Sequence, residues 1–459
     1  MKIPCAKYLP FIVTGLEFLK PALTNSQFNT IILVATALVL GGKFCLSEFN
    51  RLWLGDRCVS TLSHFFSHAK FSSNEMQHLY ALQLIHLYKP KYGYYCIDDT
   101  MKHHTNFCKW IHGVFVLFDH ALKTTLKATC IVVLYYTDGG VIKFPICFRI
   151  YYQDTKNMPW QNGKKYVCTP KYELAIEMLQ WAIDKGFPIG VVLADAWFGI
   201  DPFIKGLKRL GMSYVIEIKS SLTIRTPCKT PRLTQTGKLA KNQYDQIPLP
   251  DVFKAISSFS KCGFTANQST GKEEKVLYHT KVITTTLNAI SGSHRIVQSI
   301  DPKKGTTKYL LTNELDWEAT KTISVYSHRW VIEEFFRNAK QLSDMEGATI
   351  RSEQGVTLTI CLVSWIDSLL HYENYKLGTG GKLPKEPLTV PSIIRRSQYE
   401  NFVDFVSRVQ KDSTILTKWF NMERKNIERK RKRTNTLIEL EYIADWNMEE
   451  PMPKAAQAI

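Results

Sequence analysis

One short segment of the chain concentrates side chains that could take part in phosphate chemistry. It reads Tyr-Ser-His-Arg-Trp-Val-Ile-Glu-Glu-Phe-Phe-Arg-Asn-Ala-Lys from Tyr326 to Lys340. On a continuous helix, with about 100° between residues, one stripe would carry the acid Glu333 together with Tyr326, Arg329, Arg337 and Lys340. A solvated, salt-bridged helix face is the usual meaning of such a pattern. The segment therefore needs partners elsewhere in the chain before it indicates a site.

Acidic residues at the ends of two expected strands could be those partners. Asp98 and Asp99 end an aromatic and β-branched run, and Asp195 ends a buried apolar run. Open α/β sheets place their sites at the carboxyl ends of strands. One carboxylate from each strand and Glu333 could share two Mg²⁺ ions, which would activate the attacking oxygen and stabilise the leaving oxygen of a phosphodiester. Because alternate strand residues face opposite sides, only one of Asp98 and Asp99 should face the metals.

Hydrophobic periodicity indicates the elements that must position these side chains. Strands are expected over Gly93–Asp98, Ala128–Tyr136, Val141–Tyr152, Pro188–Asp195 and Ser213–Ile218, and helices over Phe28–Phe49, Met76–Leu87, Tyr172–Lys185, Pro202–Leu210 and Val325–Leu342. Asp138-Gly139-Gly140 predicts a hairpin, because glycine accepts the positive φ of the turn. Three strands followed by alternating helices and strands predict an α/β fold, a mixed sheet flanked by helices.

Changes in hydrophobic periodicity and composition along the chain indicate three regions. We expect a helical region over 1–88 that could bind DNA or simply pack against the rest of the chain, and a catalytic region over 89–370. A Lys/Thr/Ser-rich stretch at about 219–322 is expected to be a β-rich insertion. A basic helical region covers 371–459, in which Lys418–Arg433 carries eight Lys or Arg in sixteen positions.

Composition limits the class of protein. The 459 residues contain 59 Lys or Arg against 41 Asp or Glu, so the net charge of +18 favours a polyanionic partner. The hydrophobic share of 45% argues against a mainly disordered chain. Eleven cysteines without a Cys-x-x-Cys pair argue against a disulfide scaffold or a zinc ribbon. The longest apolar run, Ile31–Leu40, is too short to span a bilayer, so we expect a soluble cytosolic protein that does not engage the membrane.

Taken in order, these motifs resemble the DDE-type transposases of bacterial insertion sequences. More narrowly, they resemble the group with the signature Tyr-x2-Arg-x3-Glu-x6-Lys. The residues that carry the resemblance are Tyr326, Arg329, Glu333 and Lys340 for the signature, Asp99-Thr100 for the first acid, and Ala194-Asp195-Ala-Trp-Phe-Gly199 for the second. The resemblance spans roughly residues 90–360, and the ordered combination is more specific than any single motif.

The resemblance implies a ribonuclease-H-like fold and cut-and-paste DNA transposition. It implies that Asp99, Asp195 and Glu333 are catalytic and bind two Mg²⁺ ions, with Mn²⁺ as a substitute. It also implies that Tyr326, Arg329 and Lys340 hold the phosphate near the 5′ end of the element. Arg337 lies outside the signature and is a weaker candidate for phosphate contact. The implied partners are double-stranded DNA, both terminal inverted repeats and target, and a second copy of the chain on that DNA, within the bacterial cytosol and nucleoid.

Two alternatives stay open from the residues. A metal-dependent nuclease of the same fold would share the acids but would not need the Tyr/Arg/Lys stripe. A DNA-binding protein descended from a transposase, and no longer catalytic, would need neither.

Overall fold

The structure is a computed structural model that describes residues 2–104, 110–119, 122–153, 159–161, 164–228, 230–240, 244–257, 259–267, 273–379 and 389–434. The N-terminal elements are α1 (Pro10–Gly15), the 3₁₀ helix η1 (Glu17–Ala22), α2 (Asn25–Gly41), α3 (Leu46–Leu52), α4 (Val59–His68) and α5 (Ser73–Tyr88). The central elements are β1 (Tyr94–His104), β2 (Phe115–Asp119), β3 (Thr124–Thr137), β4 (Lys143–Tyr151), η2 (Pro159–Gln161), α6 (Lys171–Asp184), β5 (Val191–Ala194), α7 (Asp201–Arg209) and β6 (Ser213–Ile218).

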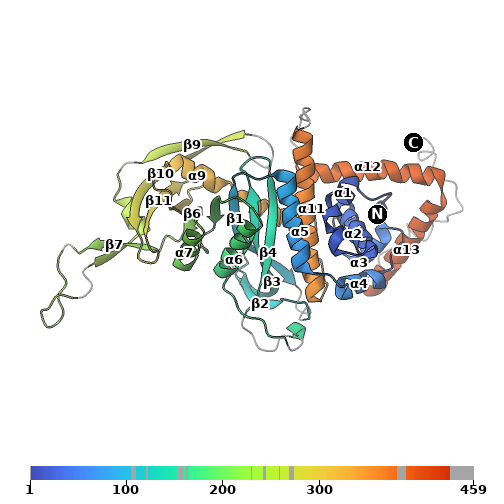
Figure 1. The fold of residues 1–459 in the computed structure, drawn as a ribbon, viewed down its shortest axis with the longest axis horizontal. Helices are drawn as coiled ribbons and strands as arrows, with labels where there is room; N and C mark the ends of the chain where they lie inside the picture. Colours follow the sequence, from blue (N-terminus) through green and yellow to red (C-terminus); the bar gives the residue numbers. More distant parts are fainter. Residues whose placement is uncertain are drawn as a thin grey trace.

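The second half of the chain begins with strands and ends with helices (Figure 1). The strand-rich part contains β7 (Thr223–Pro227), β8 (Tyr244–Pro248), α8 (Leu249–Lys254), β9 (Ser260–Asn267), β10 (Glu273–Thr286), β11 (Ser293–Ile300) and β12 (Thr307–Thr312). The helices at the end are α9 (Ala319–Ser327), α10 (Trp330–Gln341), α11 (Glu353–Thr379), α12 (Val390–Lys411) and α13 (Thr414–Thr434).

A single ten-stranded mixed sheet forms the centre of the molecule. Its order is β2-β3-β1-β5-β6-β12-β11-β10-β9, and β4 also pairs with β3. β1 is antiparallel to β3 but parallel to β5, which in turn is parallel to β6. The β-rich stretch after β6 continues this sheet, because β12 pairs with β6, while β7 and β8 form a separate two-stranded ribbon. The expected α/β fold, a mixed sheet flanked by helices, is confirmed.

The turn between β3 and β4 is the hairpin that the sequence predicts. Gly139 has φ +82°, which an L side chain would resist. The Asp138 carboxylate accepts a hydrogen bond from the Gly140 amide at 2.8 Å and closes the turn. The two strands that it joins pair antiparallel.

The single helix expected over Val325–Leu342 is wrong, because the structure has two helices. α9 ends at Ser327, and α10 begins at Trp330. At the break, the His328 ring stacks on Tyr94 at the start of β1, with 4.6 Å between ring centroids. The apolar periodicity continues across the break, so the pattern alone did not reveal it.

The helix expected over Phe28–Phe49 is also divided. Gly42 adopts a left-handed conformation with φ +60° and ends α2. α3 then leaves at an angle of 88°. Glycine is the residue that most readily takes this conformation after a helix.

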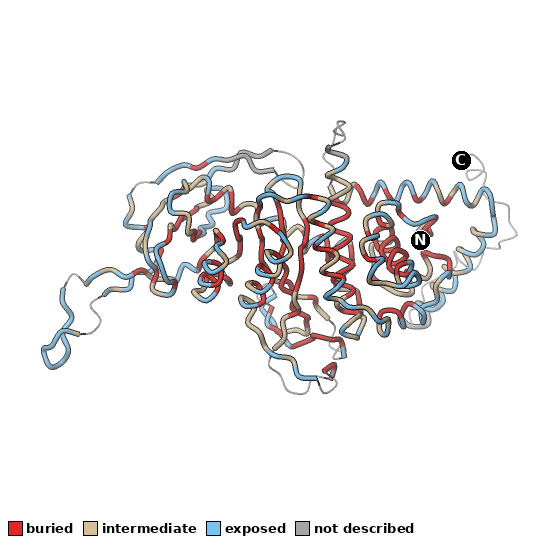
Figure 2. The backbone as a smooth tube through the Cα atoms, viewed as in Figure 1, coloured by how far each residue is buried: buried red, intermediate tan, exposed pale blue. Residues whose placement is uncertain are grey.

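Helix α11 lies between the sheet, with α5 alongside it, and the helices α1–α4 (Figure 1). It contacts β4, α10 and α5 on one side and α1, α2 and α4 on the other, and most of its length is buried (Figure 2). In the part of the chain that the structure describes, Glu353–Lys376 is the one helix long and apolar enough to cross a membrane, yet 89% of its apolar window is buried inside the protein. Its hydrophobicity is therefore explained by its central position in the core.

Candidate active site

Two of the acidic positions lie side by side at the point where β5 ends. The expectation that the first strand ends at Asp98 is wrong, because β1 continues to His104 through its pairing with β3. The β1–β5 pairing places Ile97 opposite Ala194. Asp98 and Asp195 are the next residues along the two strands, so the pairing of the sheet places them next to each other. This is the edge at which open α/β sheets place their sites.

An arginine joins the first of these acids to α10. Arg329 donates from Nη1 to the Asp98 carboxylate at 3.1 Å and from Nη2 to the Glu333 carboxylate. The Arg329 side chain is only 12% exposed, so this double ion pair is largely shielded from water. Glu333 lies in the first turn of α10, next to the helix break, and the break thereby turns Arg329 and Glu333 toward β1.

The electrostatics of this group favour an additional cation. Burial and the charge of Asp195 raise the pKa of Asp98 to about 7, although Arg329 opposes the shift. Burial also raises the pKa of Asp195, against a hydrogen bond of 3.0 Å from the Trp197 amide. Burial works against the charge of Arg329, but Tyr326 and the acids hold the pKa of its guanidinium above its usual value. Three carboxylates thus share one buried arginine.

Asp99 has different partners from Asp98. Its carboxylate pairs with Lys171 Nζ from α6 at 2.9 Å and accepts from Cys130 Sγ at 3.3 Å. Lys171 also lies over the Trp197 ring, 5.1 Å from the centroid. The structure therefore places Asp98, and not Asp99, against Arg329 and Glu333, as the alternation of strand side chains requires for one of the two.

Tyr326 extends the cluster toward β6. Its hydroxyl donates to Glu217 Oε2 at 2.9 Å, and Lys308 Nζ lies 2.8 Å from the same oxygen. The Arg329 guanidinium lies 5.7 Å from the centre of the Tyr326 ring, which is cation–π range. The charge of Glu217 raises the pKa of Asp195 as well. Tyr326, Arg329, Glu217 and the acids therefore form one connected group.

The other two basic residues of the stripe lie outside this group. Lys340 pairs with Glu346 at 3.1 Å, and Glu346 lies 3.8 Å from His103 Nδ1 near the far end of β1. Arg337 is exposed on α10. Both residues share α10 with Glu333, but they lie four and seven residues farther along it, which places them about 6 and 10 Å away along the helix axis.

Sequence reasoning missed Glu217 and Lys171. Glu217 is a single acid near the end of the strand Ser213–Ile218, and Lys171 begins α6 at a position where a surface lysine is common. Glu217 did carry a weak signal, since it is a third acid near the carboxyl end of a parallel strand. Lys171 carried none.

The donor set suits a hard divalent cation. Carboxylate oxygens are the ligands that Mg²⁺ and Mn²⁺ prefer. Among the described residues, no three His, Cys, Asp or Glu side chains are grouped so that they could hold a metal ion as they stand. The guanidinium of Arg329 lies between Asp98 and Glu333 and supplies positive charge there. The residues fit such an ion by their chemistry and by their shortage of positive charge.

A mixed sheet of this order, with acids side by side on two neighbouring parallel strands, is typical of the ribonuclease-H-like class of phosphodiester enzymes. Comparison with protein families agrees: residues 51–255 match the DDE superfamily endonuclease model, and residues 166–366 match the transposase DDE domain model. The first match contains Asp98, Asp99 and Asp195, and the second contains Asp195 and Glu333. No curated protein matches the sequence. The two family matches support a DDE-type transposase or endonuclease that acts on DNA, a class that generally uses divalent metals.

Proposed function

We propose that the chain is a DNA transposase that cleaves the ends of an insertion sequence and joins them to target DNA by a cut-and-paste route. The observation that carries this proposal is the ionic bridge of Arg329 between Asp98 and Glu333, with Tyr326 against the arginine. A nuclease needs the acids alone. The signature tyrosine and arginine lie with the acids, which favours a site that also holds a DNA end.

In this proposal Asp98, Asp195 and Glu333 hold two Mg²⁺ ions, or Mn²⁺ in their place. Asp98 replaces Asp99 as the first acid, because the Asp99 carboxylate already pairs with Lys171. The ions would activate the attacking oxygen and stabilise the leaving oxygen of the phosphodiester. Asp99 then has a positioning role, since it holds Lys171 beside Trp197 and the loop of the second acid.

The basic residues divide into two groups in this proposal. Arg329 and Tyr326 hold a phosphate next to the acids, and the fork of the guanidinium suits bidentate contact with phosphate oxygens. Lys340, on α10 near the His103 end of β1, holds a more distant phosphate. Arg337, exposed on α10, is a weaker candidate for the same contact. We expect two copies of the chain on the DNA, because two element ends are processed together.

The test uses the purified protein, Mg²⁺, a DNA that carries the element's inverted ends, and a target plasmid. Joined products support transposition, whereas cleavage without joining supports the nuclease alternative. DNA binding without either reaction supports an inactive descendant.

Glu333→Gln should abolish both reactions while duplex binding stays within about twofold, because one carboxylate charge is lost from the acid cluster. The matched control is Glu318→Gln, which changes an exposed acid at the start of α9. Strand transfer by Glu333→Gln at the control's rate would contradict the assignment of the acids.

A further inference from the structure

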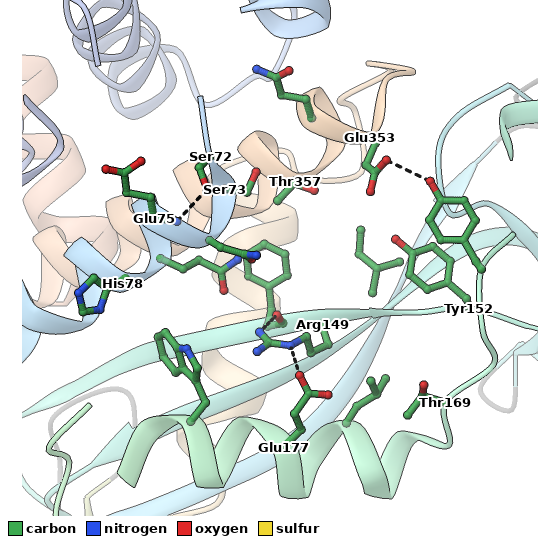
Figure 3. Close-up of a pocket in the computed structure, with 18 of the residues that line it drawn as sticks. Ser72, Ser73, Glu75, His78, Arg149, Tyr152, Thr169, Glu177, Glu353 and Thr357 are labelled. Atoms are coloured by element: carbon green, nitrogen blue, oxygen red, sulfur yellow. Dashed lines mark hydrogen bonds and ion pairs between the residues drawn. The ribbon is translucent and has the colours of Figure 1, made fainter. Parts of the chain in front are cut away.

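A large groove lies along β4 (Figure 3). Asp98, Asp195 and Glu333 are not among the residues that line it. Its volume is about 1290 Å³, and its walls come from α5, β4, α6, the first turn of α11 and residues 164–169. Pockets for small molecules usually measure roughly 300–1,000 Å³. The groove is therefore large enough for an extended ligand.

Two helix N-termini open into this groove. Ser72 caps α5 by accepting from the Glu75 amide at 3.2 Å, and Ser352 accepts from the Gly355 amide at 3.0 Å at the start of α11. Both helices are long, and each directs the positive end of its dipole toward the groove. Lys165 and Lys185 line the same space, and the Lys185 ammonium lies 5.7 Å from the centre of the Trp181 ring. These features favour an anionic ligand.

Buried polar atoms in the groove wall lack partners. Gln77 is 8% exposed, and its Oε1 has no hydrogen-bond partner among the described residues. The same holds within the described part of the chain for His78 Nδ1 and Gln354 Nε2. A buried polar group without a partner destabilises the folded state, because it has lost its hydrogen bonds to water. A ligand that offers both donors and acceptors would satisfy these atoms.

Two of the three acids that line the groove, Glu353 and Glu177, are paired with basic residues. Glu353 pairs with Lys164 at 3.3 Å and accepts from the Tyr166 hydroxyl at 3.0 Å. Glu177 pairs with Arg149 at 3.5 Å (Figure 3). The third acid of the lining, Glu75, lies in the first turn of α5. Lys165 and Lys185 come in addition to the two pairs, so the lining has four Lys or Arg side chains against three acids and keeps a positive excess.

We infer that this groove binds a short segment of single-stranded DNA, at a distance from the strand that is cut. Phosphates would lie at the two helix N-termini and the lysines, and bases would stack on Trp181 and Tyr166. The edges of unpaired bases carry the donors and acceptors that Gln77 and Gln354 lack. In a duplex those edges are already paired, and Gln77 is too deeply buried for a duplex to reach. The inference rests on the proposed function only in taking DNA as the partner.

The test is fluorescence anisotropy with the full chain in EDTA. One probe is a labelled single strand of 12 nucleotides, and the other is its duplex. Lys165→Ala combined with Lys185→Ala should weaken single-strand binding by at least about tenfold and reduce the salt dependence by about 1.4 in log–log slope. Duplex affinity should stay within about twofold. The matched control combines Lys254→Ala with Lys304→Ala, two exposed lysines outside the groove.

Gln77→Leu provides a second measurement that does not depend on charge. It removes the orphaned carbonyl oxygen, so thermal stability should hold or rise while single-strand affinity falls by at least about fivefold. Unchanged single-strand affinity in both groove variants would overturn the inference, as would equal loss of single-strand and duplex binding. Loss of binding to a poly-glutamate peptide alone, with single-strand binding unchanged, would also overturn the inference. The binding assay contains EDTA and does not depend on metal or on cleavage, so a negative result in it is distinguishable from a failure of strand transfer in Mg²⁺.

Discussion

At the scale of single residues, the neighbours Asp98 and Asp99 show how one position decides a role. Asp98 pairs with Arg329, whose other arm holds Glu333, whereas Asp99 pairs with Lys171. Strand alternation predicts that the two differ but does not say which one faces the helix. The Asp99-Thr100 match favours Asp99. In the structure it is Asp98 that faces Arg329, because of the way β1 packs against α10, and no local sequence pattern contains this packing.

Asp98→Asn is expected to reduce DNA cleavage by more than about 100-fold, since loss of groups that only support metal ligands already costs about 10–100-fold. Asp99→Asn should cost less than about tenfold, because it loosens Lys171 without removing an acid from the cluster. Single-turnover cleavage of an end-containing DNA in Mg²⁺ measures both variants. The reverse order of effects would return the role to Asp99.

At the scale of elements, α11 depends on buried polar contacts for its place. The Tyr80 hydroxyl of α5 donates to the Pro145 carbonyl of β4 at 2.9 Å and contacts Ser368 on α11. One phenol thus connects three elements in a fully buried position. Periodicity predicts α5 and the strand, but it cannot predict this connection, because the three residues are far apart in the sequence.

Tyr80→Phe should lower the free energy of unfolding by about 1–3 kcal/mol, because it leaves the Pro145 carbonyl buried without its donor. Denaturant titration followed by circular dichroism measures the change. Tyr92→Phe is the control, since Tyr92 is 53% exposed, and it should change stability by less than about 0.5 kcal/mol. Equal effects of the two substitutions would exclude a structural role for the Tyr80 hydroxyl.

Asp367 on α11 gives the fold a pH dependence. Burial raises its pKa to about 7, and Glu334 adds to the shift. The folded state keeps this proton up to about pH 7, while the unfolded chain releases it near the ordinary value of 3.8. Stability from this group is therefore greatest below about pH 4 and falls as the pH rises toward 7, by roughly 4 kcal/mol at most.

Asp367→Asn should remove this component. Between pH 4.5 and pH 7.5 the free energy of unfolding should fall less in this variant than in the unchanged protein. Denaturant titrations of both proteins at the two pH values measure it. Parallel pH profiles would show that Asp367 is ionised in the folded state throughout.

At the scale of the whole molecule, the net charge of +18 should appear as salt-dependent DNA binding. Lys425 and Arg429 are exposed on α13. Replacing both by Ala should reduce the log–log salt slope of duplex binding by up to about 1.8, with little change in sequence preference. Competition binding at several salt concentrations measures the slope. An unchanged slope would mean that α13 does not contact phosphates.

The sequence predicted most of the central sheet because its strands are continuous apolar runs bounded by clear turns. Ser213–Ile218 was predicted with the bounds that the structure has, and the hairpin at Asp138 was predicted from its glycines. The continuation of the sheet through β12 was not predicted, since strand pairing over long sequence distances leaves no local signal. The groove was missed for the same reason, because five separate segments form it.

The central position of α11 has a practical consequence for dividing the chain. Its two sides pack against different halves of the molecule, so a cut near residue 88 would strip α1, α2, α4 and α5 from a helix with buried Trp365. A fragment that begins at residue 89 is expected to aggregate when expressed, which size-exclusion chromatography would reveal. A monodisperse fragment would show that the sheet folds independently. We therefore expect the helices before β1 to fold together with the sheet that carries the acids.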